Sequence, residues 1–205
     1  LGLLADNWQL AQGDYQPIDR ALDLVDAVGP TASDSVLQSL PDYLTASYAM
    51  FEGDAPAQAR LQAYASGKLT PILTRIGYEA KAGEGPQVPL LRQNLIEALG
   101  EMGDPVLVVE AKRRFAALQS DPASLDGPLK FVWLGVVAQT AGKATWDALR
   151  VMANKAPSAL EKSQYFTLLG RAKDASLARQ ALDLAMTDEP EKTTSPAIVS
   201  AVSVD

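Results

Sequence analysis

Residues 141–174 read AGKATWDALRVMANKAPSALEKSQYFTLLGRAKD, and this stretch contains two helix-like runs joined by a short turn. Apolar residues recur every three to four positions in 144–155 and again in 158–171, as on one face of an α-helix. Ser158 stands three residues before Glu161, the spacing of a capping box that starts a helix. The stretch therefore predicts a helical hairpin. Its expected apolar positions are Trp146, Leu149, Met152, Leu160, Tyr165, Phe166, Leu168 and Leu169.

The same pattern of apolar runs between Gly, Pro and Asp signals continues along the chain in both directions. Pro41 interrupts one run, which predicts either a kink or two abutting helices there. Asp104 and Pro105 have the order expected of an N-cap and a first helical residue. The predicted helices cover 2–12, Pro17 to Gly29, 33–51, one or two helices in 56–80, then 88–102, 105–119, the strongly apolar 128–140, and a run after Asp174.

The alternation of helix, short turn and helix decides the fold class. Two such helices with their turns give a period of roughly 30–40 residues, which is typical of helical repeat arrays. We expect an all-α fold, an α-solenoid of antiparallel helix pairs (a HEAT/ARM-like superhelix) that is incomplete at its C-terminus, with a globular helical bundle as the alternative. Residues 1–205 are expected to be a single helical-repeat domain from a longer chain, with the loop 81–87 (KAGEGPQ) as the place for any subdivision.

Charge and hydropathy restrict the partners of the chain. The net charge is −7, and the 18 Lys and Arg residues are scattered rather than clustered, which disfavours nucleic acid and anionic membrane surfaces as partners. The sequence contains no apolar run of about 18 residues, so we expect no membrane-spanning helix. A soluble protein of the cytoplasm or periplasm is the expectation, and the sequence does not identify the compartment.

The sequence contains neither Cys nor His. Disulfides, thiolate or imidazole metal sites and a Ser-His-Asp triad are therefore excluded for this chain. Carboxylates remain available, and Glu97 and Glu101 are four residues apart on one predicted helix. A solvated helix face beside Arg92 explains that pair better than a cation or acid–base site.

Two further groups of residues favour structural roles. Lys112, Arg113 and Arg114 stand in the middle of a predicted helix, where solvent and ion pairs with Glu110 explain them better than a phosphate site. The tryptophans lie on otherwise apolar faces, which favours core packing over a ligand pocket. These tryptophans are Trp8, Trp133 and Trp146.

A series of short pieces in a fixed order resembles the C-terminal helical domain of zinc aminopeptidases, the family that includes aminopeptidase N and puromycin-sensitive aminopeptidase. Between residues 91 and 186 the pieces are Leu91-Arg92, EAKRRF with Phe115, KATWDAL with Trp146-Asp147, Glu161-Lys162, Leu169-Gly170, Asp174, Leu177 and LDLAM up to Met186. The start, LLADNWQLAQGDY followed by PIDRALDLV, resembles the family's opening helices. The chain departs from the family pattern at EPEKTTSP and at Phe131.

The resemblance implies a non-catalytic domain that caps the chamber of the active site and shapes peptide access. Family members bind zinc through a His-Glu-x-x-His segment in a separate catalytic domain, so no cofactor is expected in this chain and zinc is expected in its parent. The implied partners are that catalytic domain and peptide substrates. Candidate peptide contacts are Arg92, Lys130 and Tyr165, polar or amphipathic groups beside apolar faces. The alternative is a free-standing HEAT-like scaffold that binds a protein partner.

Overall fold

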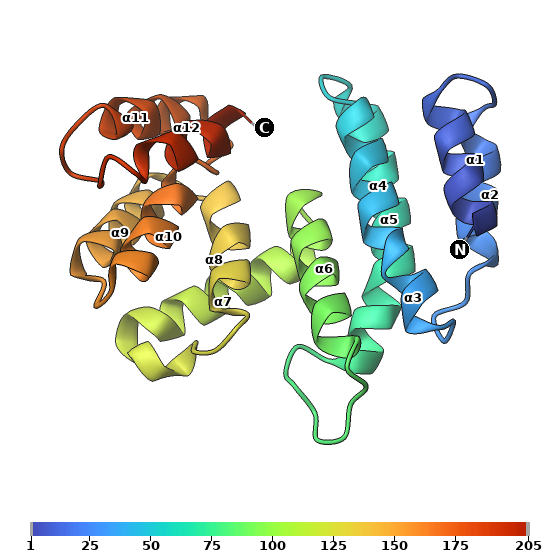
Figure 1. Ribbon diagram of the computed structural model, residues 1–205, viewed down its shortest axis with the longest axis horizontal. Helices are drawn as coiled ribbons and strands as arrows, with labels where there is room; N and C mark the ends of the chain where they lie inside the picture. The colour runs from blue at the N-terminus through green and yellow to red at the C-terminus, as the bar shows by residue number, and fades with distance from the viewer. Residues whose placement is uncertain (1, 204–205) are drawn as a thin grey trace. The chain divides into compact units, whose positions relative to one another are not determined.

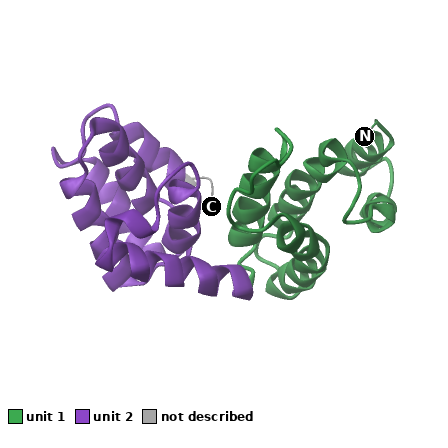
Figure 2. Ribbon diagram, turned by 90° about the horizontal axis from the view of Figure 1, so that it is seen from below, with its two compact units in different colours: residues 1–104 green, residues 105–205 purple. Residues whose placement is uncertain are grey.

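The computed structural model describes residues 2–203, which form helices and the turns between them (Figure 1). The all-α prediction is confirmed. The chain divides into two compact units, residues 1–104 and 105–205 (Figure 2). The loop 81–87 lies inside the first unit, so the observed division falls elsewhere. Incompleteness at the C-terminal end of the array stays a prediction.

The first unit contains six helices in its described part. They are α1 (Gly2–Gln12), α2 (Ile18–Ala27), α3 (Asp34–Leu37), α4 (Ser39–Met50), α5 (Ala55–Ile76) and α6 (Val88–Glu101). Helices α1 and α2 form a hairpin, and α4, α5 and α6 pack against one another. Trp8 of α1 stacks on Tyr43 of α4 at a centroid separation of 4.7 Å, and joins the hairpin to the other helices.

Two prolines of this unit, Pro41 and Pro71, lie within helical runs. The run 33–51 is broken into two abutting helices at Gln38, which confirms one of the two outcomes predicted for it. Pro41 thereby falls in the first turn of α4, where its missing N–H has no intrahelical acceptor to lose. Pro71, by contrast, lies inside the single 22-residue helix α5.

The second unit begins with Pro105 as the first residue of a helix, as predicted. Its described elements are α7 (Pro105–Ser120), a short 3-10 helix η1 (Pro122–Ser124), α8 (Lys130–Gln139), α9 (Lys143–Lys155), α10 (Ala159–Leu169), α11 (Ala175–Ala185) and α12 (Ser195–Ser203). Consecutive helices pair as α7–α8, α9–α10 and α11–α12, and the second helices of the pairs also touch, α8 with α10 and α10 with α12. This stacking of helix pairs agrees with the predicted α-solenoid class.

The start signals read from the sequence are confirmed in the second unit. The Ser158 hydroxyl accepts a hydrogen bond from the Glu161 amide at 3.2 Å, and the Asp174 carboxylate accepts bonds from the amides of Ser176 and Leu177. The capping side chains thus fix the first turns of α10 and α11.

Each unit has its own apolar core, and the three tryptophans are buried in them as predicted. Trp8, Trp133 and Trp146 are at most 2% exposed. Three leucines that fit the helical period of their runs are nevertheless exposed. These are Leu3, Leu90 and Leu160, at 67%, 49% and 70% exposure.

Candidate functional site

Two of the three candidate contact residues come together in the structure. Lys130 is the first residue of α8 and Tyr165 lies in the middle of α10, and the Lys130 ammonium is 5.6 Å from the centre of the Tyr165 ring. Arg92 belongs to α6 in the other unit. The candidates therefore form one pair and one separate residue.

The pair is part of a four-residue group, which we call the Lys130 cluster: Lys130, Phe131, Glu161 and Tyr165. The Lys130 ammonium donates to the Glu161 carboxylate at 3.1 Å. Phe131 meets Tyr165 edge to face, with ring centres 5.1 Å apart. The ammonium also lies 5.4 Å from the Phe131 ring, so two aromatic rings and one carboxylate surround the cation.

The geometry of the two helices accounts for the cluster. Lys130 and Glu161 both occupy the first turn of a helix, and their ion pair holds the starts of α8 and α10 together. A carboxylate is favoured at a helix N-terminus, whereas an ammonium is disfavoured there. Glu161 therefore compensates for the position of Lys130. The side chains remain 15% and 31% exposed, so solvent reaches the pair.

The environment fixes the protonation states of the cluster. Burial is the largest single influence on the pKa of Lys130 and acts to lower it. The hydrogen bond to Glu161 and the interactions with Tyr165 and the Glu161 charge together outweigh burial, so the pKa of Lys130 lies above its ordinary value. Burial also raises the pKa of the Tyr165 phenol, although the nearby ammonium opposes that shift. At neutral pH the cluster thus presents a charged ammonium beside a neutral phenol, both able to donate hydrogen bonds to a carbonyl or carboxylate.

Arg92 has a structural environment. It is 2% exposed, and its guanidinium donates to the Gly77 carbonyl at 2.8 Å and to Glu84 at 2.5 Å. Glu84 lies in the loop that precedes α6, so Arg92 holds this loop against the helix. The expectation that Arg92 lies beside the solvated Glu97 face was wrong, because its side chain turns inward to the loop. We therefore leave Arg92 out of the candidate contact surface.

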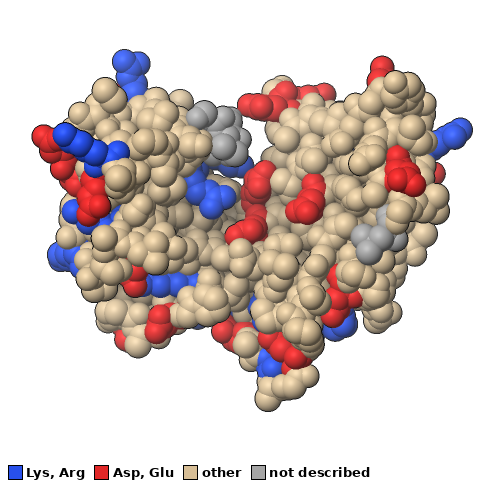
Figure 3. All heavy atoms as spheres, viewed as in Figure 1, with Lys and Arg blue, Asp and Glu red and all other residues tan. Residues whose placement is uncertain are grey.

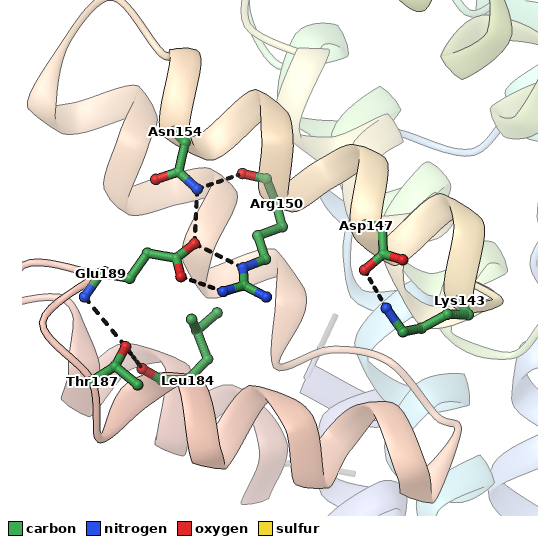
Figure 4. A network of polar contacts seen from close by, with 7 residues as sticks. All are labelled: Lys143, Asp147, Arg150, Asn154, Leu184, Thr187 and Glu189. Carbon is green, nitrogen blue, oxygen red and sulfur yellow. Dashed lines mark hydrogen bonds and ion pairs between the residues drawn. The ribbon is translucent and has the colours of Figure 1, made fainter.

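A second polar network lies where the α11–α12 connection meets α9 (Figure 4). The Arg150 guanidinium donates to both oxygens of Glu189, and its Nε lies 2.7 Å from Oε1. The Asn154 amide donates to the same carboxylate at 2.8 Å. These side chains use their hydrogen-bonding groups on one another. The network therefore holds the α11–α12 connection against α9 rather than forming an open binding site.

The basic triplet has the environment predicted for it. Glu110 pairs with Arg113 at 2.7 Å and with Arg114 at 2.8 Å, and these hydrogen bonds lower the pKa of the Glu110 carboxyl. On the face that Figure 3 shows, blue and red side chains lie side by side on the second unit, at the left, whereas red ones predominate on the first unit. Among the described residues, no three carboxylates gather as metal ligands, and none of the helices in residues 2–203 is both long and apolar enough to span a bilayer.

A model of the ERAP1-like C-terminal domain family matches residues 1–205. The chain belongs to this family. The resemblance to the C-terminal helical domain of aminopeptidases, read from short pieces of sequence, is thereby confirmed over the whole chain.

Three curated relatives of the domain come from rice, Oryza sativa subsp. japonica. Aminopeptidase M1-A is 27% identical over 194 residues, 92% of this chain and 22% of the relative. Aminopeptidase M1-C is 26% identical over 196 residues, again 92% and 22%. Aminopeptidase M1-B is 23% identical over 211 residues, 100% of this chain and 24% of the relative. The chain thus spans less than a quarter of the length of these relatives.

Sequence reasoning missed the partners of the candidate residues. Glu161 was read as a capping residue and as part of the Glu161-Lys162 piece, Glu84 as part of the loop 81–87, and Glu189 as the first residue of the segment EPEKTTSP. Each of these carboxylates accepts from a basic side chain on a helix. Opposite charges at the ends of adjacent helices were the available signal for Glu161, whereas the path of a loop determines the other two pairs.

Proposed function

We propose that this chain is the non-catalytic C-terminal domain of a zinc aminopeptidase, where it caps the chamber of the active site and shapes peptide access. The observation that carries the proposal is the family match over residues 1–205, together with relatives that are aminopeptidases several times longer than this chain. A domain of this kind acts through its shape and surface rather than through catalytic groups.

The composition supports a catalytic domain elsewhere in the parent. The 205 residues include no His and no Cys, so the His-Glu-x-x-His ligands of the family's zinc do not fit any part of this chain. Zinc, and the hydrolysis of the N-terminal peptide bond, would belong to the parent's catalytic domain. That catalytic domain is the proposed partner of this one, and peptides are the proposed substrates.

Within this domain, the Lys130 cluster is the proposed contact for peptides. Lys130 offers a partly exposed ammonium that two rings and Glu161 hold in place. A fixed ammonium suits a peptide carbonyl or a terminal carboxylate, because little side-chain entropy remains to be lost on binding. Tyr165 is 3% exposed, so it supports the ammonium and contributes its hydroxyl rather than a broad surface.

The parent itself is the first thing to test. We expect an antibody against this domain to recover, from the native source, a polypeptide several times larger than 21.8 kDa that contains zinc and releases N-terminal residues from peptides. A zinc-free protein of about the mass of this chain would overturn the proposal. It would leave the free-standing scaffold as the explanation.

The peptide contact is tested in the same parent enzyme with Lys130→Met, which keeps most of the aliphatic stem and removes the charge. For a long peptide we expect KM to rise about tenfold, the equivalent of ~1.4 kcal/mol. For an aminoacyl anilide, which is too short to reach this domain, kcat/KM should not change. Equal effects on both substrates, or on neither, would exclude the contact.

A matched control is available in the same unit. Lys143 also pairs with a carboxylate, that of Asp147, and also lies over an aromatic ring, 5.5 Å from the centre of Trp146. Lys143→Met therefore removes a similar set of interactions away from the cluster. It should leave both substrates unaffected.

A further inference from the structure

A pocket in the first unit lies between the α2–α3 connection and the middle of α5. Its volume is about 220 Å³. Pro30, Leu40 and Ile72 give it apolar walls, and Asp26 and Lys68 stand at its polar side. It belongs to neither the Lys130 cluster nor the Arg150 network, which are both in the second unit.

A glycine and a proline on α5 shape this pocket. Gly67 lies in the interior of α5, where glycine costs roughly 1 kcal/mol relative to alanine. A Cβ added there would meet no atom within 4 Å, so close packing does not require the glycine. Pro71 stands four residues later and has no N–H for the Gly67 carbonyl. Both residues line the pocket, so the helix presents a backbone acceptor to it.

Asp26 provides a second acceptor. The Tyr64 hydroxyl donates to Asp26 Oδ1 at 2.7 Å, and the Lys68 ammonium lies 2.8 Å from the same oxygen. Both of these contacts are made to Oδ1, so Oδ2 keeps its capacity to accept a hydrogen bond. The side chain is 53% exposed. The hydrogen bonds from Lys68 and then Tyr64 lower the pKa of Asp26, which keeps this acceptor charged at neutral pH.

The charge around the pocket favours a cation as the occupant. Asp19, Asp23 and Asp26 follow one another at intervals of four and three residues and share one face of α2. Among the residues that line the pocket, Lys68 supplies the one opposing charge. An arriving cation is therefore attracted along this face, whereas an anion would meet three carboxylates.

We propose that this pocket binds the side chain of an arginine carried by a peptide, with its aliphatic stem on Pro30 and Ile72 and its guanidinium on Asp26 Oδ2 and the Gly67 carbonyl. A guanidinium presents five donors in a planar fork and reaches two separate acceptors at once, which an ammonium does less well. It is also weakly hydrated, and tolerates the neighbourhood of Lys68 better.

This inference does not depend on aminopeptidase activity of the parent, and is tested on the 205-residue chain. We would follow backbone amide NMR signals during a titration with N-acetyl-arginine amide, which resembles an arginine inside a peptide. Saturable shifts centred on Gly29, Gly67 and Lys68 are expected, with a dissociation constant on the order of millimolar, because the ligand is small. N-acetyl-leucine amide should cause no saturable shift there. Equal binding of the two amides would overturn the proposal.

Two variants test the assigned acceptors and the open space. Asp26→Asn removes the charge from a half-exposed side chain, and Gly67→Met fills the pocket with a residue that favours helix more than glycine does. Each should weaken binding of N-acetyl-arginine amide at least tenfold. Asp19→Asn, which removes a charge from the same helix outside the pocket, is the matched control and should weaken it less than threefold.

Each remaining outcome decides against the proposal. If Gly67→Met raises stability but binds like the native chain, Gly67 and Pro71 only bend the helix. If Asp26→Asn and Asp19→Asn weaken binding equally, the attraction is the general charge of α2. Free arginine, which carries an additional carboxylate, should bind more weakly than the amide. Tighter binding of free arginine would identify an amino-acid site and not a peptide site.

Discussion

The two units use the same element, the amphipathic helix, in different ways. In the second unit, short helices follow one another as pairs, and side chains such as Ser158 and Asp174 cap their first turns. In the first unit, α3 and α4 abut at Gln38, Pro71 lies inside α5, and a long loop is held down by Arg92. Regularity in the second unit comes from local signals, whereas the first unit depends on contacts between distant residues.

This difference predicts how substitutions in each unit change the free energy of unfolding. At Gly170 in the second unit, the Ile198 carbonyl oxygen of α12 lies 2.5 Å from the place of an added Cβ, so substitution there should be costly. At Gly67 of α5 in the first unit, an added Cβ would meet no atom within 4 Å, so the same substitution should be tolerated or even stabilising. Substitutions at matched positions in the two units test this difference.

The largest effect is expected for Trp146→Ala in the second unit. Trp146 is 1% exposed and its indole N–H donates to the Leu169 carbonyl at 3.1 Å, which fastens α9 to α10. Removing a buried aromatic side chain costs about 3–5 kcal/mol in unfolding free energy. Hydrogen exchange should accelerate in α9 and α10, with α4 to α6 as the internal reference. Equal acceleration in both units would show that they unfold together, and would weaken the comparison.

Replacing two glycines by alanine should change the unfolding free energy in opposite directions. At Gly170 a Cβ would lie 2.5 Å from the Ile198 carbonyl oxygen and 2.9 Å from the Ala201 Cβ, so Gly170→Ala must push α12 away. Such overpacking costs about 1–3 kcal/mol. At Gly67 nothing obstructs the Cβ, and Gly67→Ala should stabilise by about 0.5–1 kcal/mol through helix propensity. Urea unfolding of the two variants measures the change in unfolding free energy for each. A change of the same sign in both variants would contradict this prediction.

A smaller difference in unfolding free energy is expected between alanine variants of two serines that precede helices. Ser158 accepts a hydrogen bond from the Glu161 amide, whereas Ser33, also at an N-cap, caps no amide with its side chain. Ser158→Ala should therefore cost about 1 kcal/mol, the usual value for a lost cap. Ser33→Ala should change the unfolding free energy by only a few tenths. Thermal unfolding of both variants tests this, and a larger loss at Ser33 would contradict it.

The smallest effect is a pH dependence in the Arg150 network. The hydrogen bond from Arg150 is the main cause that lowers the pKa of Glu189 below its usual value of 4.5. A folded-state pKa below the unfolded one stabilises the fold above pH 4.5, and this contribution disappears as the pH falls through the folded-state pKa. For so exposed a pair it amounts to about 0.5 kcal/mol or less.

Arg150→Met removes this contribution while keeping much of the side chain. Unfolding free energies of the native chain and the variant should differ at pH 7 and converge as the pH falls through the lowered pKa of Glu189. Asp147, Lys143 and Lys162 also act on this network, so Lys143→Met serves as a control that should keep the pH dependence. A gap between native and Arg150→Met that persists at low pH would indicate lost packing instead.

The sequence predicted most of the helices, because their boundaries depend on local signals. Ser158, Asp174 and Pro105 mark helix starts by chemistry that operates within one turn. Which apolar positions are buried was less predictable. Leu3, Leu90 and Leu160 fit the helical period, but the packing partner of each helix decides how wide its buried face is.

The candidate site was predictable only in part, for a physical reason. Lys130 and Tyr165 were expected as separate contacts, and the structure places them 5.6 Å apart through the pairing of α8 with α10. Their partner Glu161 lies 31 residues from Lys130 in the sequence. The sequence pattern indicated that Arg92 lies on the surface, but the loop that contains Glu84 folds onto it and buries it. Long-range pairing of charges leaves no periodic signal in a single sequence.

Helix α10 contacts four other helices, α8, α9, α11 and α12. In evolutionary terms, a residue that contacts several neighbours at once can change only if all of them accept the replacement. Phe166 and Leu169 on the inward face of α10, and Gly170 directly after it, should therefore vary least among members of the family. The partly exposed start of the same helix, with Glu161, is free to diverge, and descendants of one ancestral scaffold could acquire different ligand preferences there while keeping the stack intact.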